Sequence, residues 1–376
     1  MLIKNAKLIL PDTVRDGAVL IKNGRIERVI TEGNLPQAEH VYDASGAYLA
    51  PGFVDVHIHG TGGHGTEDMT AQSLLDMSLT LAGLGVTSFF PTLYPGSKAE
   101  MIKNLKGIVG AFGKEQGAKL RGLHLEGPFI SPEKPGVMKP QDISPVDIDF
   151  MSELVEAGEG KIKIMTFAPE VDGADKLIDF AAKHGIFLQA GHTNATYEQM
   201  MAARAKGISH VTHLFNAMSP FTHRAPGAAG AAMMEDFSVE IIADGVHVHP
   251  AVVSFLGRIK KPEQIVLVTD ALKPTEQHGG PMLANREAVK LDGGVFKRLT
   301  DNVIAGSALT MLHGIKNLVS YGFPLENAIL AAASNPAKIL GVKDCGVVMA
   351  GMAADITLFD ASFNLQKVFI DGKILS

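Results

Sequence analysis

Eight apolar, β-rich runs along the middle of the chain constrain its fold more than any other feature. They cover residues 52–59, 86–93, 119–126, 161–168, 186–192, 209–215, 238–247 and 264–270. Amphipathic segments with a helical period separate most of them, for example TAQSLLDMSLTLAGLG and ADKLIDFAAKHG. Continuous apolar strands that alternate with helices are typical of parallel sheets, and eight such units predict a closed (β/α)8 TIM barrel. An open doubly wound sheet is the alternative, but it usually needs fewer units.

The two ends of the chain have a different pattern. Apolar and polar residues alternate with a period of two near the N-terminus and again over the last stretch, MAADITLFDASFNLQKVFIDGKIL. Asn23-Gly24 and Asp371-Gly372 lie between such runs, and both pairs tolerate the positive φ of a tight hairpin turn. We therefore expect one small β-domain that is assembled from both termini.

The residues at the ends of the eight predicted strands carry the chemistry of the chain. In a (β/α)8 barrel the carboxyl ends of the strands meet at one rim, where active sites lie. Six of the eight strands bring histidine or carboxylate side chains to that rim, and the main ones are His57, His59, Glu126, His192, His213, His247 and Asp270. The other histidines, including His40, His184, His210, His278 and His313, show no such placement.

These rim residues suit a metal site. His57 and His59 are two residues apart, so they point to the same side of their strand. With Glu126, His192, His213 and Asp270 they offer nitrogen and oxygen ligands for zinc or another first-row divalent ion. The two oxygens of Glu126 could bridge two ions. A bound ion lowers the pKa of water toward neutrality, and Asp270 could accept and pass on a proton.

Other functional classes fit the sequence less well. Gly60, Gly62 and Gly65 form a G-x-G-x-x-G pattern, but the next strand ends in FFPTLYP, without the acidic residue of a dinucleotide site. The net charge of -6 argues against a nucleic-acid partner. No segment approaches the roughly 20 apolar residues of a membrane helix. The single cysteine, Cys345, excludes an internal disulfide and indicates a cytoplasmic location.

Six short blocks carry a family resemblance. They are HLEGPF (124–129), GHTNAT (191–196), THLFNAM (212–218), DGVHVHP (244–250), VTDA (268–271) and AGSALTM (305–311). Together they resemble the amidohydrolase superfamily and, within it, the N-acetylglucosamine-6-phosphate deacetylases. The resemblance implies a metal-dependent barrel over residues 51–343 and a small β-sandwich domain from residues 1–50 and 344–376. The implied reaction is hydrolysis of the acetamide of N-acetyl-D-glucosamine 6-phosphate to D-glucosamine 6-phosphate and acetate, in amino-sugar metabolism.

The same resemblance implies roles for single residues. Glu126, His192 and His213 would hold the main metal, and His57 and His59 a second ion that Glu126 bridges. Asp270, also near the metal, would act as the catalytic base and then as the acid, and His247 would contact the sugar and help to polarise the site. The remaining substrate contacts would come from Asn216 and Ala217 on the phosphate side and from Val137, Ile304, Ala305 and Gly306. The cofactor would be one or two divalent ions, zinc or iron. Arg224, in FTHRAPG, would reach the phosphate from the partner subunit of a homodimer.

One departure and two alternatives remain open. In KPGVMKP, Met138 lies where relatives often carry a histidine near the acetyl group, and methionine cannot donate a hydrogen bond to a carbonyl oxygen. A second metal or another group such as His64 could take that role, or the preference for the acyl group differs. A cyclic-amide hydrolase or deaminase is one alternative function, but the fourth strand ends in MTFAPE, without the bridging lysine of many such enzymes. An inactive scaffold is the other, and the complete ligand set argues against it.

Overall fold

The eight predicted runs form one parallel sheet in a computed structural model that describes residues 1–375. The strands follow one another in chain order around the sheet, so each pairs with the next along the chain. They are β6 (Phe53–Ile58), β9 (Val86–Leu93), β11 (Leu123–Glu126), β12 (Ile162–Phe167), β13 (Phe187–Ala190), β14 (His210–Val211), β15 (Ser238–Ile242) and β16 (Ile265–Val268), with the short β10 (Lys119–Leu120) beside β9. Nearly every residue in them is buried, which explains their continuous apolar sequences.

Contacts between the first and last strands close the barrel. The backbone N–H of Asp270 donates to the carbonyl of His57 at 2.9 Å, and the N–H of His59 donates to Ala271 at 2.9 Å. Below them, the Thr269 hydroxyl donates to the buried carboxylate of Asp55 at 2.6 Å. The predicted (β/α)8 fold is confirmed, and closure places the ends of β6 and β16 next to each other.

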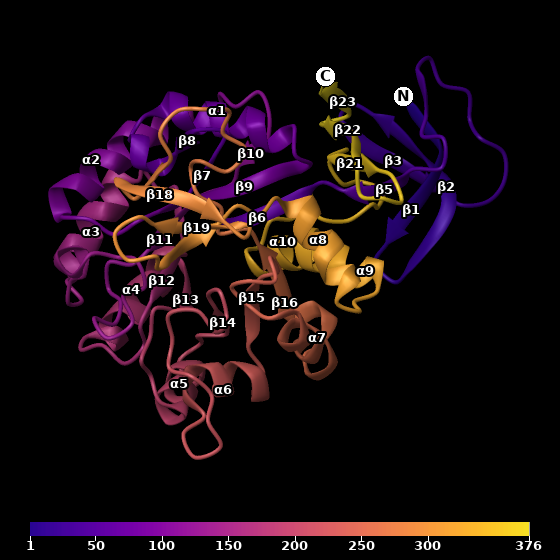
Figure 1. Cartoon of the computed structure of the whole chain (residues 1–376). Helices are drawn as coiled ribbons and strands as arrows, with labels where there is room; N and C mark the ends of the chain where they lie inside the picture. Colours follow the sequence, from indigo (N-terminus) through magenta and orange to yellow (C-terminus); the bar gives the residue numbers. More distant parts are fainter. Residues whose placement is uncertain (376) are drawn as a thin grey trace.

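Helices cover the outside of this barrel (Figure 1). The main ones are α1 (Ala71–Ala82), α2 (Lys98–Ile108), α3 (Ile148–Ala157), α4 (Ala174–His184), α5 (Tyr197–Ala205), α6 (Gly227–Met234), α7 (Pro250–Ile259), α8 (Met311–Ser320), α9 (Leu325–Ile329) and α10 (Asn335–Ile339). Shorter turns are η1 (Thr66–Asp68), η2 (Val109–Ala111), η3 (Pro140–Asp142), η4 (Pro262–Gln264) and the π-helical η5 (Leu330–Ser334). Local sequence sets their starts: Ser97 and Glu100 form a capping box at α2, as Thr196 and Gln199 do at α5. None of the helices within residues 1–375 combines the length and the apolar character that crossing a membrane requires.

Both chain termini build a second sheet, at the upper right of Figure 1. Its strands are β1 (Leu2–Leu10), β2 (Thr13–Lys22), β3 (Arg25–Ile30), β4 (Val41–Asp43), β5 (Tyr48–Pro51), β21 (Ile356–Phe359), β22 (Leu365–Ile370) and β23 (Lys373–Leu375). The two ends of the chain meet where β21 pairs with β5. Both predicted hairpin turns occur, since Asn23-Gly24 joins β2 to β3 and Asp371-Gly372 joins β22 to β23, each with positive φ.

An antiparallel flap follows the last barrel strand, and the sequence analysis did not predict it. It consists of β17 (Leu283–Ala284), β18 (Glu287–Asp292), β19 (Val295–Arg298) and β20 (Ile304–Ser307). A smaller hairpin, β7 (Gly60–Thr61) with β8 (His64–Gly65), lies in the glycine-rich loop after β6. The flap has its own small core of Leu272, Ala284, Val289 and Phe296. The turn residues Gly293-Gly294, between two short runs of mixed apolar and charged residues, were the signal that could have revealed it.

Candidate active site

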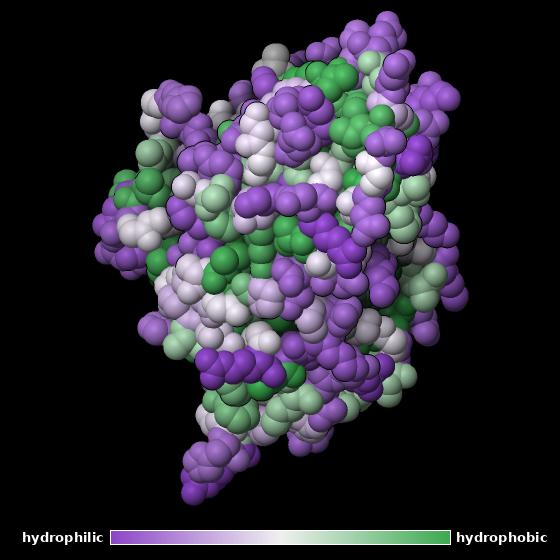
Figure 2. All heavy atoms as spheres, turned by 90° about the vertical axis from the view of Figure 1, so that its right-hand side faces the viewer, coloured by the Kyte–Doolittle hydropathy of each residue, from purple (hydrophilic) through white to green (hydrophobic). Residues whose placement is uncertain are grey.

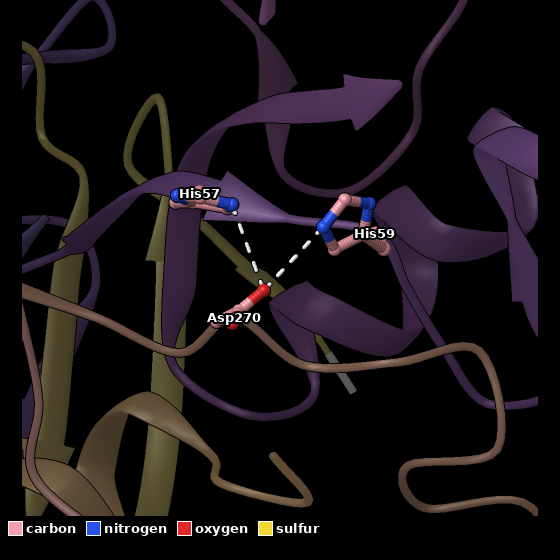
Figure 3. Close-up of side chains that lie close together, drawn as sticks. All are labelled: His57, His59 and Asp270. Atoms are coloured by element: carbon pink, nitrogen blue, oxygen red, sulfur yellow. Dashed lines mark ion pairs between the residues drawn. The ribbon is translucent and has the colours of Figure 1, made fainter. Parts of the chain in front are cut away.

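The two histidines of the first barrel strand meet the aspartate of the last one. His57 is on β6, His59 follows it directly, and Asp270 lies just beyond β16 (Figure 3). The Nε2 atoms of His57 and His59 are 3.6 Å and 3.4 Å from Oδ1 of Asp270. Barrel closure therefore brings His57 and His59 next to Asp270, which lies more than 200 positions later in the sequence.

Glu126, at the end of β11, lies at the centre of four histidines. Its Oε1 atom is 3.3 Å from Nε2 of His57, 3.1 Å from Nε2 of His192 and 3.0 Å from Nε2 of His213. Its Oε2 atom is 3.2 Å from Nε2 of His59. All five side chains are almost fully buried. A carboxylate whose two oxygens contact different histidines has the arrangement of a ligand that bridges two metal ions.

Unusual backbone conformations direct three of these side chains. His192, His213 and Asp270 have positive φ values of 45°, 25° and 48°. L-residues rarely adopt this region, and such strained positions concentrate at functional sites. Each residue lies two positions beyond the end of its strand, in the turn at the rim of the barrel.

The electrostatics of the cluster depend on the coupling between histidines and carboxylates. Burial disfavours charge on His57, but the nearby Glu126, Asp270 and Glu240 carboxylates raise its pKa well above the usual value. Burial likewise opposes the ionised form of Glu126, yet His57 and hydrogen bonds from His192 and His213 lower its pKa well below the usual range. Positive charge on the histidines therefore stabilises the ionised form of the buried carboxylates.

The donor set fits a divalent metal ion. Ligand atoms of His57, His59 and Asp270 lie within 4.8 Å of one another, and so do those of His57, Glu126 and His213. The Nε2 atom of His57 is buried without a hydrogen-bond partner among the described residues, although it points at the two carboxylates. An imidazole nitrogen in this position is what a metal site requires.

A second layer of contacts at Nδ1 orients three of the histidines, His57, His59 and His192, so that Nε2 faces the centre. Nδ1 of His59 donates to the carbonyl of Thr92 at 3.1 Å, and Nδ1 of His192 donates to that of Lys134 at 3.0 Å. Nδ1 of His57 lies 3.0 Å from Glu240, a fully buried carboxylate on β15. The sequence analysis missed Glu240, although an acidic residue inside the apolar run SVEII was a usable signal.

His124 has a structural role below the site. Its ring is buried inside the barrel, with Nε2 2.8 Å from the Thr166 hydroxyl and Nδ1 3.1 Å from the Val56 carbonyl. Burial, together with the nearby His57, lowers the pKa of His124 to about 3, so the ring is neutral. It connects neighbouring strands and contributes no ligand atom to the cluster.

A cleft with about 670 Å³ of free space, part of it open to solvent, lies over the cluster. Its lining includes every predicted substrate-contact residue except Arg224: Val137, Asn216, Ala217, His247, Ile304, Ala305 and Gly306. Nδ1 of His247 lies 2.6 Å from Asp244, which fixes the ring. The side-chain amide of Asn216 donates to the carbonyls of His213 and Leu214, whereas the backbone N–H of Ala217 has no protein acceptor within residues 1–375. Three further lining residues, Tyr94, Gly136 and Val246, were not predicted.

Arg224 and His64 lie apart from this cleft. Arg224 is on an exposed loop before α6, which projects at the bottom of Figure 1 and forms the hydrophilic protrusion at the bottom of Figure 2. Nδ1 of His64 lies 3.7 Å from the carboxylate of Asp76 on α1, and His64 does not line the cleft. The structure therefore gives no support to His64 as a replacement for the group that Met138 lacks.

Comparisons with known proteins agree with this geometry. A profile of the amidohydrolase family matches residues 48–375. An N-acetylglucosamine-6-phosphate deacetylase from Bacillus subtilis is 32% identical over 383 residues, covering 100% of this chain and 96% of the relative. An N-acetylgalactosamine-6-phosphate deacetylase from Escherichia coli O157:H7 is 31% identical, covering 87% and 88%. The crystal structure of N-acetylglucosamine-6-phosphate deacetylase from Pasteurella multocida superposes with a TM-score of 0.93 at 29% identity, covering 100% and 99%.

Proposed function

Since the chain belongs to the amidohydrolase family, we propose that it hydrolyses the acetamide of N-acetyl-D-glucosamine 6-phosphate to D-glucosamine 6-phosphate and acetate, in amino-sugar metabolism. One observation carries the proposal. The cleft is lined by seven residues expected to contact the sugar phosphate and by five members of the cluster, His59, Glu126, His192, His213 and Asp270, although they come from separate parts of the chain. A cytoplasmic location remains a prediction from the sequence.

The cluster is the proposed metal site. Glu126, His192 and His213 would hold one divalent ion, zinc or iron, and His57 and His59 would hold a second ion that shares Glu126. When bound, the metal supplies a water of lowered pKa and a positive charge for the carbonyl oxygen. The central carboxylate and the buried, unpaired Nε2 of His57 support this assignment.

Two residues would act directly on the acetamide. Asp270 borders the ligands and opens into the cleft, so it can accept a proton from the attacking water and deliver it to the departing amine. His247 faces the same cleft, and its contact with Asp244 holds the other ring nitrogen ready to bond the substrate. The chemistry needs both a proton carrier and a polarised carbonyl, and these residues are placed for the two tasks.

Phosphate recognition would involve two subunits. Among residues 1–375, no lysine or arginine lines the cleft. The free N–H of Ala217 can donate to a phosphate oxygen, while Asn216 holds the surrounding loop. We propose a homodimer in which Arg224, on its projecting loop, reaches the phosphate in the partner's cleft, because a guanidinium matches phosphate oxygens in charge and geometry.

The epimeric substrate N-acetyl-D-galactosamine 6-phosphate is a second candidate, because one relative bears that activity in its name. The deciding experiment measures acetate release from both phosphorylated sugars and from unphosphorylated N-acetylglucosamine, with metal analysis of the same sample. We expect the N-acetylglucosamine phosphate to be hydrolysed with the highest kcat/KM and the protein to contain one or two divalent ions per subunit. Equal rates with and without the phosphate would contradict the phosphate assignment, and no acetate from any of the three would contradict the activity.

A further inference from the structure

Tyr94 separates the cleft from a second cavity. This cavity, with about 330 Å³ of free space that is partly open to solvent, is lined by Thr66, Glu67, Met69, Tyr94, Pro95 and others on α2 and the flap. In the part of the chain that the structure describes, Tyr94 alone lines both spaces. Its side chain, directly after β9, is therefore the wall between them.

The wall is held rigidly. The Tyr94 ring stacks on the ring of His59 with centroids 3.8 Å apart and planes 6° from parallel. It also packs against the flap core around Leu272 and Phe296, together with Ala305. The ring, held from both sides, limits the space at this end of the cleft.

The loop that carries Met138 contacts the flap next to residues that line the second cavity. Lys139, next to Met138, lies 3.7 Å from Glu287 of the flap. The neighbouring flap residue Arg286 bonds Glu100 at 2.7 Å, and both line the second cavity. The loop that carries Met138 and the cavity behind Tyr94 are therefore joined through two adjacent flap residues.

The lining of the cleft indicates which part of the substrate lies beside Tyr94. Asn216 and His247 are polar and suit the sugar and its phosphate, whereas Tyr94, Val137 and Met138 offer apolar surface. The amide carbonyl of the substrate would lie at the cluster. The nitrogen of this amide carries the polar sugar, and its carbonyl carbon carries an apolar methyl group. The methyl group matches the apolar surface that the Tyr94 ring offers beside His59.

We propose that Tyr94 closes the acyl end of the cleft and sets the largest N-acyl group that the enzyme hydrolyses. The inference rests on the proposed function, because it takes the acetamide as the reacting bond. The acetyl methyl fills the space in front of Tyr94, and longer acyl chains collide with a ring that His59 and the flap core hold in place. Removing the ring would free the volume that the ring itself fills and would join the cleft to the narrow cavity behind it.

The test compares Tyr94→Ala with the matched control Tyr94→Phe, which keeps the ring. We would measure kcat/KM for the N-acetyl, N-propionyl and N-butyryl derivatives of glucosamine 6-phosphate. In Y94A the butyryl-to-acetyl ratio should rise by at least about tenfold, the scale on which a pocket discriminates a methylene group. In Y94F it should stay close to that of the wild type. An unchanged ratio in Y94A, or an equal rise in Y94F, would overturn the assignment.

Loss of the stacking on His59 could abolish turnover in Y94A for every substrate. In that case the dissociation constants of the three sugar phosphates, measured by calorimetry on the inactive but folded variant, provide the same ratio. Relatively tighter binding of the butyryl sugar supports the wall, and equal weakening of all three refutes it. The wild-type protein is assayed first on the acetyl sugar, so that failure of the proposed function is distinguished from failure of this inference.

Discussion

Glu240 controls the geometry of the histidine cluster without being one of its predicted ligands. Its Oε2 atom accepts from Nδ1 of His57 at 3.0 Å and from the backbone N–H of His213 at 3.1 Å. Its Oε1 atom accepts from the side-chain amide of Gln189 at 2.9 Å. Burial raises the pKa of Glu240, but His57 and hydrogen bonds from His210 and His57 outweigh it and lower the pKa well below the usual range. The carboxylate therefore stays ionised and keeps the proton of His57 on Nδ1.

Replacing this residue by its amide tests that role. In Glu240→Gln, three donors converge on a side chain that has one acceptor oxygen, so His57 loses its fixed orientation. We expect metal affinity to fall by about 10- to 100-fold, the usual range for residues that support a ligand. Dialysis against buffers of defined free zinc, followed by metal analysis, measures it. The exposed Glu263→Gln variant serves as the control, and wild-type affinity in E240Q would show that Glu240 does not position the ligand.

At the level of elements, the end of α7 caps the end of α6. The ammonium group of Lys260, just beyond α7, donates to the carbonyls of Ala232 at 3.0 Å and Glu235 at 2.8 Å. Ala232 lies in the last turn of α6 and Glu235 directly follows the helix. Carbonyls at this end of a helix lack intrahelical hydrogen-bond partners. Burial lowers the pKa of Lys260 to about 8, against the opposing effect of Asp236 and Glu235.

This lowered pKa predicts a specific dependence of stability on pH. Between pH 8 and about 10.4, the ordinary pKa of lysine, the unfolded chain binds a proton that the folded chain does not. The contribution of Lys260 to the free energy of unfolding must therefore rise with pH in that window. We expect the difference in unfolding free energy between wild type and Lys260→Met to grow from pH 7.5 to pH 10 in urea titrations. Lys261→Met is the exposed control, and a difference that falls with rising pH would contradict the prediction.

The elements differ in how far the sequence revealed them. The eight barrel strands were predictable because strands covered on both faces are apolar throughout, and this pattern is local. The flap was missed because its strands are short and carry exposed polar residues such as Lys290 and Asp292 on β18, so they resemble a long loop. Its edge at Ile304–Ser307 nevertheless supplies part of the cleft lining.

At the level of the whole molecule, the proposed dimer predicts complementation between two defective variants. Arg224→Ala removes the cation from the neighbouring cleft, and Asp270→Asn removes the proton carrier from its own. In a mixed dimer, the subunit with intact Asp270 receives an intact Arg224 from its partner. Co-expressed in equal amounts, the variants should restore about a quarter of wild-type turnover, since half of the dimers are mixed and each has one complete site.

Acetate release from the co-expressed pair, compared with each variant alone, measures the effect. Unphosphorylated N-acetylglucosamine provides the matched control substrate, because R224A should hydrolyse it at the wild-type rate. A co-expressed pair no more active than the sum of its separate components would place Arg224 outside the partner's cleft. Full activity of R224A alone on the phosphorylated sugar would remove it from substrate recognition.

The sequence alone determined the barrel, the hairpins of the terminal sheet and the chemical types of the site residues. Each of these depends on local properties, namely the period of the apolar residues, the turn residues and the position of a side chain at the end of its strand. Tertiary structure alone decided that Glu126 lies among four histidines, that Glu240 holds two of them, and that Tyr94 separates two cavities. These relations join strands that are distant in the chain, and the register and closure of the barrel set them.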